Sequence, residues 1–298
     1  MNAELRTSYS SPTVTVTEFL CKEEPHAVSD PERTVVDAFS FVRHGSFVYE
    51  SGGATTEFHT HHILLENAGE YHVVRHRHTC GDECVIVEIP HRILDEVRRV
   101  HWKKEARGFK HRRADDRLFP LTVVRSTPAL EYLQRRLVHP THADGKPLER
   151  IVADAIALRL VSELFATLYR SGSDTVLPIS SPQPRSHHLE IVERAREFMF
   201  ACLAQDLSLS EIAAAAYASE FHFSRIFKAV TSHSPRQYLL RVRLSHALFL
   251  LQETKRTVTE IAGLSGFNSL SHFVATFSGK YGVSPTRART RRNIPAGR

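Results

Sequence analysis

The C-terminal third of the chain contains two copies of one pattern, and this repeat constrains the fold more than any other feature of the sequence. Five parts of the first copy recur in the same order at an offset of 49 or 50 residues: Ile212-Ala213 as Ile261-Ala262, Ser219 as Ser269, Phe223 as Phe273, Phe227 as Phe277, and Ser234-Pro235 as Ser284-Pro285. Self-similarity of this kind indicates two copies of one supersecondary unit.

Each copy predicts a helix, a short turn and a second helix. In the first copy, Ser208 or Ser210 caps the helix SEIAAAA, and the turn around Tyr217-Ala218 precedes SEFHFSRIFKAV. In the second copy, Thr257 or Thr259 caps TEIAGLS, and Gly266 supplies the turn before SLSHFVATFSGKY. Phenylalanines at i and i+4 predict the buried side of each second helix, so the opposite side is free to enter a DNA major groove.

The segment PRQYLLRVRLSHALFLLQET between the two copies predicts one long helix. About 18 helical residues make a rod about 27 Å long. Such a rod would hold the two second helices about one turn of DNA apart.

The charge of the chain is divided unevenly along its length. Residues 1–186 hold 24 Lys and Arg against 25 Asp and Glu, a balance of −1, whereas residues 187–298 hold 15 against 8, a balance of +7. A polyanion is one partner that this segregation suggests, because each neutralised phosphate releases counterions. A basic domain without such a partner is the alternative.

From Leu189 to Arg289 the chain resembles the AraC/XylS family of transcription regulators. The similarity lies in LSLSEIA, SRIFK, RVRLSHALFLLQET, TEIAGLSGFNSLSHF and YGVSP, which stand in the order and spacing of the family. The resemblance implies two helix-turn-helix units that read DNA, and a cupin-like sensing and dimerising domain before them.

The resemblance also implies which side chains read bases. In the first unit these positions are Phe221, Ser224 and Arg225, with His222 beside them. Arg225 is the best candidate, because a guanidinium can bond to guanine through two hydrogen bonds, although a phosphate contact or an internal ion pair is the alternative.

The second unit departs from this pattern. Its corresponding positions are Leu270, Ser271, Val274 and Ala275, which offer few hydrogen bonds, so we expect mainly methyl contacts, aided by His272. In the first unit, Tyr217 replaces the usual turn glycine, and a positive φ at a residue other than glycine costs about 1 kcal/mol.

Basic side chains at helix ends are expected to contact phosphates, which position a protein without reading sequence. The candidates are Lys228, Arg241, Arg243 and Lys280, followed by Arg287, Arg289, Arg291 and Arg292 near the C-terminus.

The fold class expected for the whole chain is α+β. Short alternating runs between residues 35 and 90, separated by glycines, predict an antiparallel barrel or sandwich. The domains expected are a poorly ordered tail (1–24), a cupin-like sensor β-barrel (25–127), a helical dimerisation segment (128–170), a Ser/Pro-rich linker (171–186) and an all-α DNA-binding domain (187–298) with its two helix-turn-helix units joined by the long helix. In the dimerisation segment, one broad apolar arc holds Leu158, Val161, Leu164, Phe165, Leu168 and Tyr169.

The segment HVVRHRHTCGDEC gathers side chains that can bind metal. If residues 72–80 form a strand, His72, His76, His78 and Cys80 point to one side, and a turn at Gly81-Asp82 brings back Cys84. A zinc site and a redox pair of Cys80 and Cys84 are alternatives to an ordinary strand and turn. Because the spacing matches no strong motif, we expect no cofactor, and His76, His78, Cys80 and Cys84 stay weak metal candidates.

These patterns predict a sequence-specific DNA-binding transcriptional regulator that responds to a small-molecule effector. The expected partners are double-stranded DNA, a second copy of the chain and, if the protein is an activator, RNA polymerase. The expected location is the cytoplasm, because the sequence shows no export signal or membrane span. The alternatives are a regulator without a ligand and a metal-dependent cupin-type enzyme, but no Gly-x-Gly-x-x-Gly, P-loop, Gly-x-Ser-x-Gly or His-Glu-x-x-His motif supports catalysis.

Overall fold

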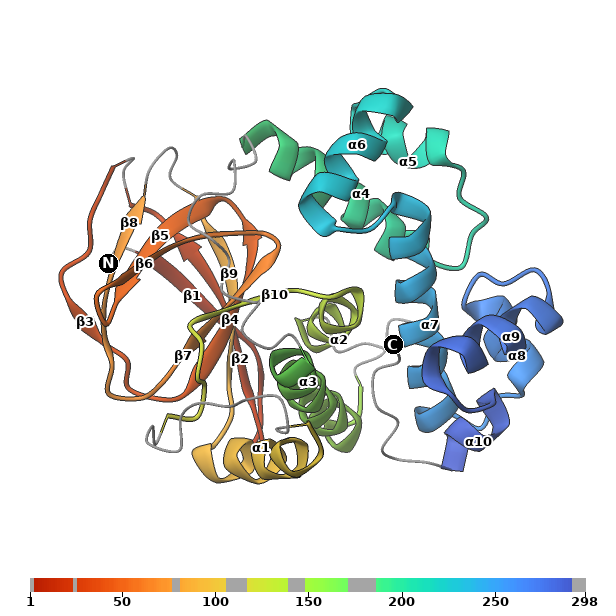
Figure 1. Cartoon of the computed structure of the whole chain (residues 1–298), viewed down its shortest axis with the longest axis horizontal. Coiled ribbons are helices and arrows are strands. Elements are labelled where there is room, and N and C mark those ends of the chain that lie inside the picture. The colour runs from red at the N-terminus through yellow and green to blue at the C-terminus, as the bar shows by residue number, and fades with distance from the viewer. Residues whose placement is uncertain are drawn as a thin grey trace. The chain divides into compact units, whose positions relative to one another are not determined.

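The structure of the chain is a computed structural model in which contacts define two units (Figure 1). The first unit contains residues 1–126 and 133–189, and the second contains residues 127–132 and 190–298. Within the described residues, no helix has both the length and the apolar character that crossing a bilayer requires. The structure describes residues 3–23, 26–76, 81–105, 117–138, 148–170 and 186–290.

The first unit is built on two antiparallel sheets. The larger sheet has the strand order β1-β2-β9-β4-β7-β10, and the smaller has the order β3-β8-β5-β6. The strands are β1 (Ala3–Ser10), β2 (Thr15–Cys21), β3 (Glu32–Arg33), β4 (Ala38–His44), β5 (Ser46–Ser51), β6 (Ala54–His59), β7 (His62–Glu66), β8 (Tyr71–His76), β9 (Glu83–Glu88) and β10 (Val123–Arg125).

Apolar side chains from both sheets form one core. β4 lies between β9 and β7, and its residues 38–42 are all buried, as expected for a strand covered on both faces. The core cluster contains Val42, Phe47, Tyr49, Phe58, Leu64, Val74, Cys84 and Val123. The predicted antiparallel β-domain is therefore confirmed at the level of its sheets.

The prediction of a poorly ordered tail over residues 1–24 is wrong. β1 pairs with β2, and β2 pairs with β9 in a register that sets Leu20 opposite Glu83. The reason is the alternation of threonine and valine in TVTVT, which buries Val14 and Val16 and exposes more of the threonines between them. This segment extends the larger sheet by two strands.

Three helices follow the sheets: α1 (His91–Glu105), α2 (Pro128–Val138) and α3 (Arg150–Arg170). α3 packs against α1, and His101 Nε2 lies 2.9 Å from Ser162 Oγ. Asp154 on α3 accepts hydrogen bonds from three hydroxyls at the β1–β2 connection, those of Tyr9, Ser11 and Thr13.

The apolar arc predicted on α3 is largely buried. Leu158 keeps 39% of its surface exposed, whereas the other five members are buried, namely Val161, Leu164, Phe165, Leu168 and Tyr169. Phe165 stacks on Phe119, with ring centroids 5.8 Å apart. Packing within the unit therefore covers most of the arc, and dimerisation through this segment stays a prediction.

The second unit contains seven helices within the described residues. α7 runs between the two helix-turn-helix units, which are formed by α5 with α6 and by α8 with α9 (Figure 1). The helices are α4 (Ser186–Ala201), α5 (Leu209–Ala215), α6 (Glu220–Thr231), α7 (Pro235–Glu253), α8 (Val258–Leu264), α9 (Leu270–Tyr281) and α10 (Pro285–Thr290).

Helix caps repeat in the two copies. The Ser208 side chain accepts a hydrogen bond from the Glu211 N–H, while Glu211 accepts from the Ser208 N–H, which closes a capping box at the start of α5. Thr257 and Glu260 form the same box at α8. Of the alternative caps, Ser208 and Thr257 are therefore the ones that the fold uses.

The two turns differ as the sequence predicted. Tyr217 has a φ of 55°. Gly266, at the corresponding position of the second helix-turn-helix unit, has a φ of 75°. Gly266 also lies against the rest of the unit, because a Cβ there would be 2.7 Å from both Arg243 Nε and the Leu203 carbonyl oxygen. Gly282, which ends α9 with a φ of 69°, has open space around it.

Inside the first unit, Glu66 lies at the end of β7 beside two hydroxyl donors. Ser40 and Tyr49 donate hydrogen bonds of 3.4 and 3.5 Å to its carboxylate. Burial raises the pKa of Glu66 to about 7, although the Ser40 and Tyr49 hydroxyls oppose this shift. Burial, followed by the nearby Glu66, also raises the pKa of Tyr49, which therefore stays a neutral donor.

The raised pKa of Glu66 predicts that stability falls as pH rises. Between about pH 4.5 and 7 the folded chain keeps a proton that the unfolded chain releases, and above pH 7 the loss of stability is complete, on the order of 3 kcal/mol. Glu66→Gln should remove this part of the pH dependence and unfold at higher urea than the wild type at pH 8. Equal pH dependence of urea unfolding in both proteins would contradict this assignment.

Gly266 and Gly282 provide a matched test of the second turn. Alanine at either position incurs the cost of a positive φ, about 1 to 2 kcal/mol, but only at Gly266 does the added Cβ meet other atoms. Gly266→Ala should lower the free energy of unfolding by about 3 kcal/mol, and Gly282→Ala by about half as much. Urea unfolding followed by circular dichroism measures both losses, and losses of equal size would show that the close approach at Gly266 costs nothing.

Candidate nucleic-acid interface

One face of α6 is exposed and carries the four side chains predicted to read bases. Phe223 and Phe227 are fully buried, which turns the opposite face outward. Phe221 keeps 83% of its surface exposed, and Arg225, one helical turn later, is also exposed. Ser224 and His222 lie half-buried beside them. The structure therefore brings the four residues together at the N-terminal half of α6.

α9 has the same orientation but a less polar surface. Phe273 and Phe277 are buried, and Leu270, Ser271 and His272 are exposed in the first turn. Further along, Val274 is half-buried and Ala275 is exposed. The side chains placed outward on this helix offer hydroxyl, imidazole and methyl groups, but no guanidinium.

The predicted phosphate contacts differ in how much of each side chain is exposed. Lys228 and Arg287 are exposed, whereas Arg241 and Lys280 are half-buried. The Lys280 ammonium lies 5.4 Å from the centre of the Tyr281 ring. Arg291 and Arg292 lie outside the described residues.

Two of the predicted phosphate contacts hold loops within the unit. Arg243 donates from Nε to the Leu203 carbonyl at 3.0 Å and from its terminal nitrogen to the Gln205 carbonyl. Arg289 donates to the carbonyls of Thr254 and Arg256 in the same manner. Each of these loops leads directly into the capped first helix of a unit. A phosphate contact by Arg243 or Arg289 stays a prediction. It requires the guanidinium to bond a phosphate while it also donates to these carbonyls.

Sequence reasoning did not pick out three further exposed cations of this unit. Arg236 lies in the first turn of α7, directly after the repeated Ser-Pro pair, and Lys255 and Arg256 precede α8. The position of Arg236 beside the Ser-Pro pair was a usable signal, because helix N-termini attract phosphates.

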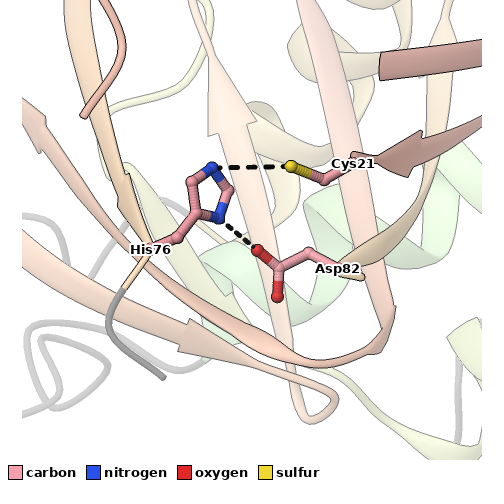
Figure 2. Close-up of side chains that lie close together, drawn as sticks. All are labelled: Cys21, His76 and Asp82. Atoms are coloured by element: carbon pink, nitrogen blue, oxygen red, sulfur yellow. Dashed lines mark hydrogen bonds and ion pairs between the residues drawn. The ribbon is translucent and has the colours of Figure 1, made fainter. Parts of the chain in front are cut away.

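The weak metal candidates of the first unit separate from one another. His76, at the end of β8, lies beside Cys21 and Asp82 (Figure 2). His72 instead stacks on Tyr49, with ring centroids 4.9 Å apart, and Cys84 lies in the apolar core. Burial raises the pKa of the Cys84 thiol, which keeps it protonated. His78 and Cys80 lie outside the described residues. Sequence reasoning missed Cys21, since nothing in its local sequence indicates a neighbour on β8.

Comparisons with known proteins agree with the geometry of the second unit. A family model described as a helix-turn-helix domain matches residues 202–291. The probable transcriptional regulator LumQ of Photobacterium leiognathi is 36% identical over 85 residues, 28% of this chain and 34% of LumQ. The transcriptional regulator ArgR of Pseudomonas aeruginosa is 30% identical over 131 residues, 44% of this chain and 39% of ArgR. The chain thus spans little more than a third of the length of these curated relatives.

A solved structure of an AraC-type transcriptional regulator from Chromobacterium violaceum is 30% identical, covers 36% of this chain and 95% of its own, and superposes with a TM-score of 0.34. The second unit is a DNA-binding domain with two helix-turn-helix units. Residues 202–291 are thus a helix-turn-helix domain of the type found in AraC/XylS regulators. LumQ and ArgR are both named as regulators, in line with the expectation that the chain is not an enzyme.

Proposed function

We propose that the protein is a sequence-specific DNA-binding transcriptional regulator whose helices α6 and α9 enter neighbouring major grooves of one duplex. The observation that carries this proposal is the pair of outward faces on α6 and α9, which buried phenylalanines fix in both copies. α7, with 19 residues, is about 28 Å long and separates the two helix-turn-helix units by roughly one turn of DNA. The balance of +7 over residues 187–298 favours phosphate binding.

The two helices read their grooves unequally in this proposal. Arg225 can donate two hydrogen bonds to O6 and N7 of a guanine, and Phe221 can contact a thymine methyl. On α9, Leu270 and Ala275 offer only methyl groups, while Ser271 and His272 offer single hydrogen bonds. The half-site read by α6 therefore supplies most of the base discrimination, and the half-site read by α9 supplies mainly docking.

Substitution of Arg225 tests this division in the full chain. Arg225→Ala should weaken binding to DNA from upstream of the protein's own gene by about 10- to 100-fold, because one bidentate contact is worth roughly 1 to 3 kcal/mol. The loss should vanish on DNA in which the contacted guanine is replaced. Ala275→Ser, the matched change on α9, should alter affinity less than 3-fold. Fluorescence anisotropy across a salt series measures both variants.

Two results would contradict the proposal. The first is binding of the wild type that is no tighter to the upstream DNA than to random DNA at every salt concentration. The second is an equal loss by Arg225→Ala on every sequence, which would make Arg225 a phosphate contact.

We further propose that a small-molecule effector binds in the first unit, at a surface hollow of about 430 Å³. This volume suits a small ligand. Val35 and Val36 line the hollow and are exposed, and the Glu88 carboxylate lies among the lining groups. His91 Nδ1 lies 2.6 Å from the buried Asp37 carboxylate at its edge. Apolar walls beside a carboxylate favour a ligand with an apolar body and an ammonium group.

A thermal-shift measurement with phenethylamine and related aromatic amines tests the hollow. At ten times its Kd a ligand should stabilise the folded chain by about 1.4 kcal/mol. Val36→Arg should abolish the shift because the long side chain fills the hollow, whereas Val100→Arg, an equally exposed valine on α1, should leave it unchanged. No shift with any amine, or an equal shift in Val36→Arg, would support a regulator without such a ligand.

Dimerisation, a cupin-like barrel, contact with RNA polymerase, activation and a cytoplasmic location remain predictions. An enzyme of the metal-dependent cupin type is disfavoured by the regulator names of the relatives.

A further inference from the structure

Three side chains that can bind metal meet at one end of the sheets in the first unit. Cys21 is the last residue of β2, His76 is the last residue of β8, and Asp82 immediately precedes β9. Their exposed fractions are 2%, 4% and 1%, and one donor atom of each lies within 4.8 Å of the others. Figure 2 shows the Cys21 thiol beside one nitrogen of the imidazole and the Asp82 carboxylate beside the other. Residues at the ends of β2 and β8 and directly before β9 thus form one buried group.

The distance between sulfur and nitrogen matches that of two ligands on one metal ion. Cys21 Sγ and His76 Nε2 are 3.6 Å apart. For a tetrahedral zinc ion with bonds of about 2.3 Å to sulfur and about 2.05 Å to nitrogen, this separation is about 3.5 Å. The separation of the two donors therefore fits a shared ion.

Asp82 lies where a hydrogen bond from Nδ1 fixes the tautomer of His76 that can bind a metal. Its Oδ2 lies 2.6 Å from His76 Nδ1, and Figure 2 shows the thiol and the carboxylate on the same side of the imidazole. When Nδ1–H donates a hydrogen bond to this carboxylate, Nε2 carries no proton, and its lone pair can bind a metal ion. Metal-bound histidines almost always donate this second N–H to a carboxylate, a backbone carbonyl or water, and a carboxylate increases the basicity of the ligand.

The surroundings favour a thiolate and a cation together. The backbone N–H of Glu23 donates to Cys21 Sγ at 3.5 Å. Asp82 Oδ1 has no hydrogen-bond partner within the described part of the chain, and it fills the space beside Gly45, where a Cβ would be 2.1 Å away. A divalent ion together with one thiolate and one carboxylate makes an electrically neutral group, which removes the cost of a buried net charge.

We propose that Cys21 and His76 bind one divalent metal ion of the zinc class, with Asp82 as the residue that positions His76. A thiolate and an imidazole select zinc, cobalt and similar ions over magnesium or calcium. Two protein ligands leave further coordination positions open to water or to a small anion. This site lies in the first unit and does not depend on DNA binding.

Titration of the full chain with Co²⁺ tests the site directly. After treatment with a chelator and a reductant, the wild type should take up one Co²⁺ per chain with the near-ultraviolet absorption of a cobalt–thiolate bond, and Zn²⁺ should displace it. Cys21→Ser should lack this absorption, and Asp82→Asn should bind 10- to 100-fold more weakly. Cys84→Ser, which changes a buried cysteine of the core, should bind as the wild type does.

Two outcomes would overturn the proposal. One is a folded wild type, checked by circular dichroism, that shows no cobalt–thiolate absorption, since the three side chains would then form hydrogen bonds only. The other is an unchanged absorption in Cys21→Ser. Because DNA binding is not measured, neither outcome bears on the proposed function of the second unit.

Discussion

The burial of one aromatic pair on the second helix of each helix-turn-helix unit determines how that helix is rotated. The ring centroids of Phe223 and Phe227 are 5.4 Å apart, and those of Phe273 and Phe277 are 5.5 Å apart. Because the pair at i and i+4 occupies one side of the helix, residues on the opposite side, such as Phe221 and Arg225, face outward. The set of side chains that can meet DNA depends on this packing.

The two helix-turn-helix units share this packing but differ in their turns and in their exposed side chains. The first helix-turn-helix unit has Tyr217 and Ser232 at positive φ. The second helix-turn-helix unit has glycines at the corresponding positions, Gly266 and Gly282. The first helix-turn-helix unit therefore carries more backbone strain, and it also carries the exposed guanidinium of Arg225. The second helix-turn-helix unit has relaxed turns and an outer face without a guanidinium. This contrast suggests that the strained first helix-turn-helix unit discriminates between DNA sequences and that the relaxed second one docks on the DNA.

Local patterns in the sequence predicted most of the second unit. The caps at Ser208 and Thr257, the positive φ of Tyr217 and the buried phenylalanines depend on neighbours within one or two helical turns. The bonds of Arg243 were not predictable in this way, because their acceptors lie about 40 residues earlier. An arginine in a basic helix looks like a phosphate contact until the tertiary fold places carbonyl oxygens around it.

The first unit was less predictable because its strands pair over long distances. The Thr-Val alternation near the N-terminus is short, and only the pairing of β2 with β9 shows that it belongs to a sheet. The same pairing brings Cys21 beside Asp82, and His76 joins them from β8 of the other sheet, although the histidine cluster alone had indicated Cys80 and Cys84. Side chains that meet through strand register cannot be identified from their spacing in the sequence.

In the proposed function, one chain places two recognition helices in successive major grooves and reads them unequally. Dimethyl sulfate and hydroxyl-radical footprinting of the full chain, on DNA from upstream of its gene, observes both grooves at once. We expect two protected segments about one helical turn, or 10 to 10.5 base pairs, apart, with strong guanine N7 protection in only one of them. A single protected segment, or equal guanine protection in both, would contradict unequal reading by two helices.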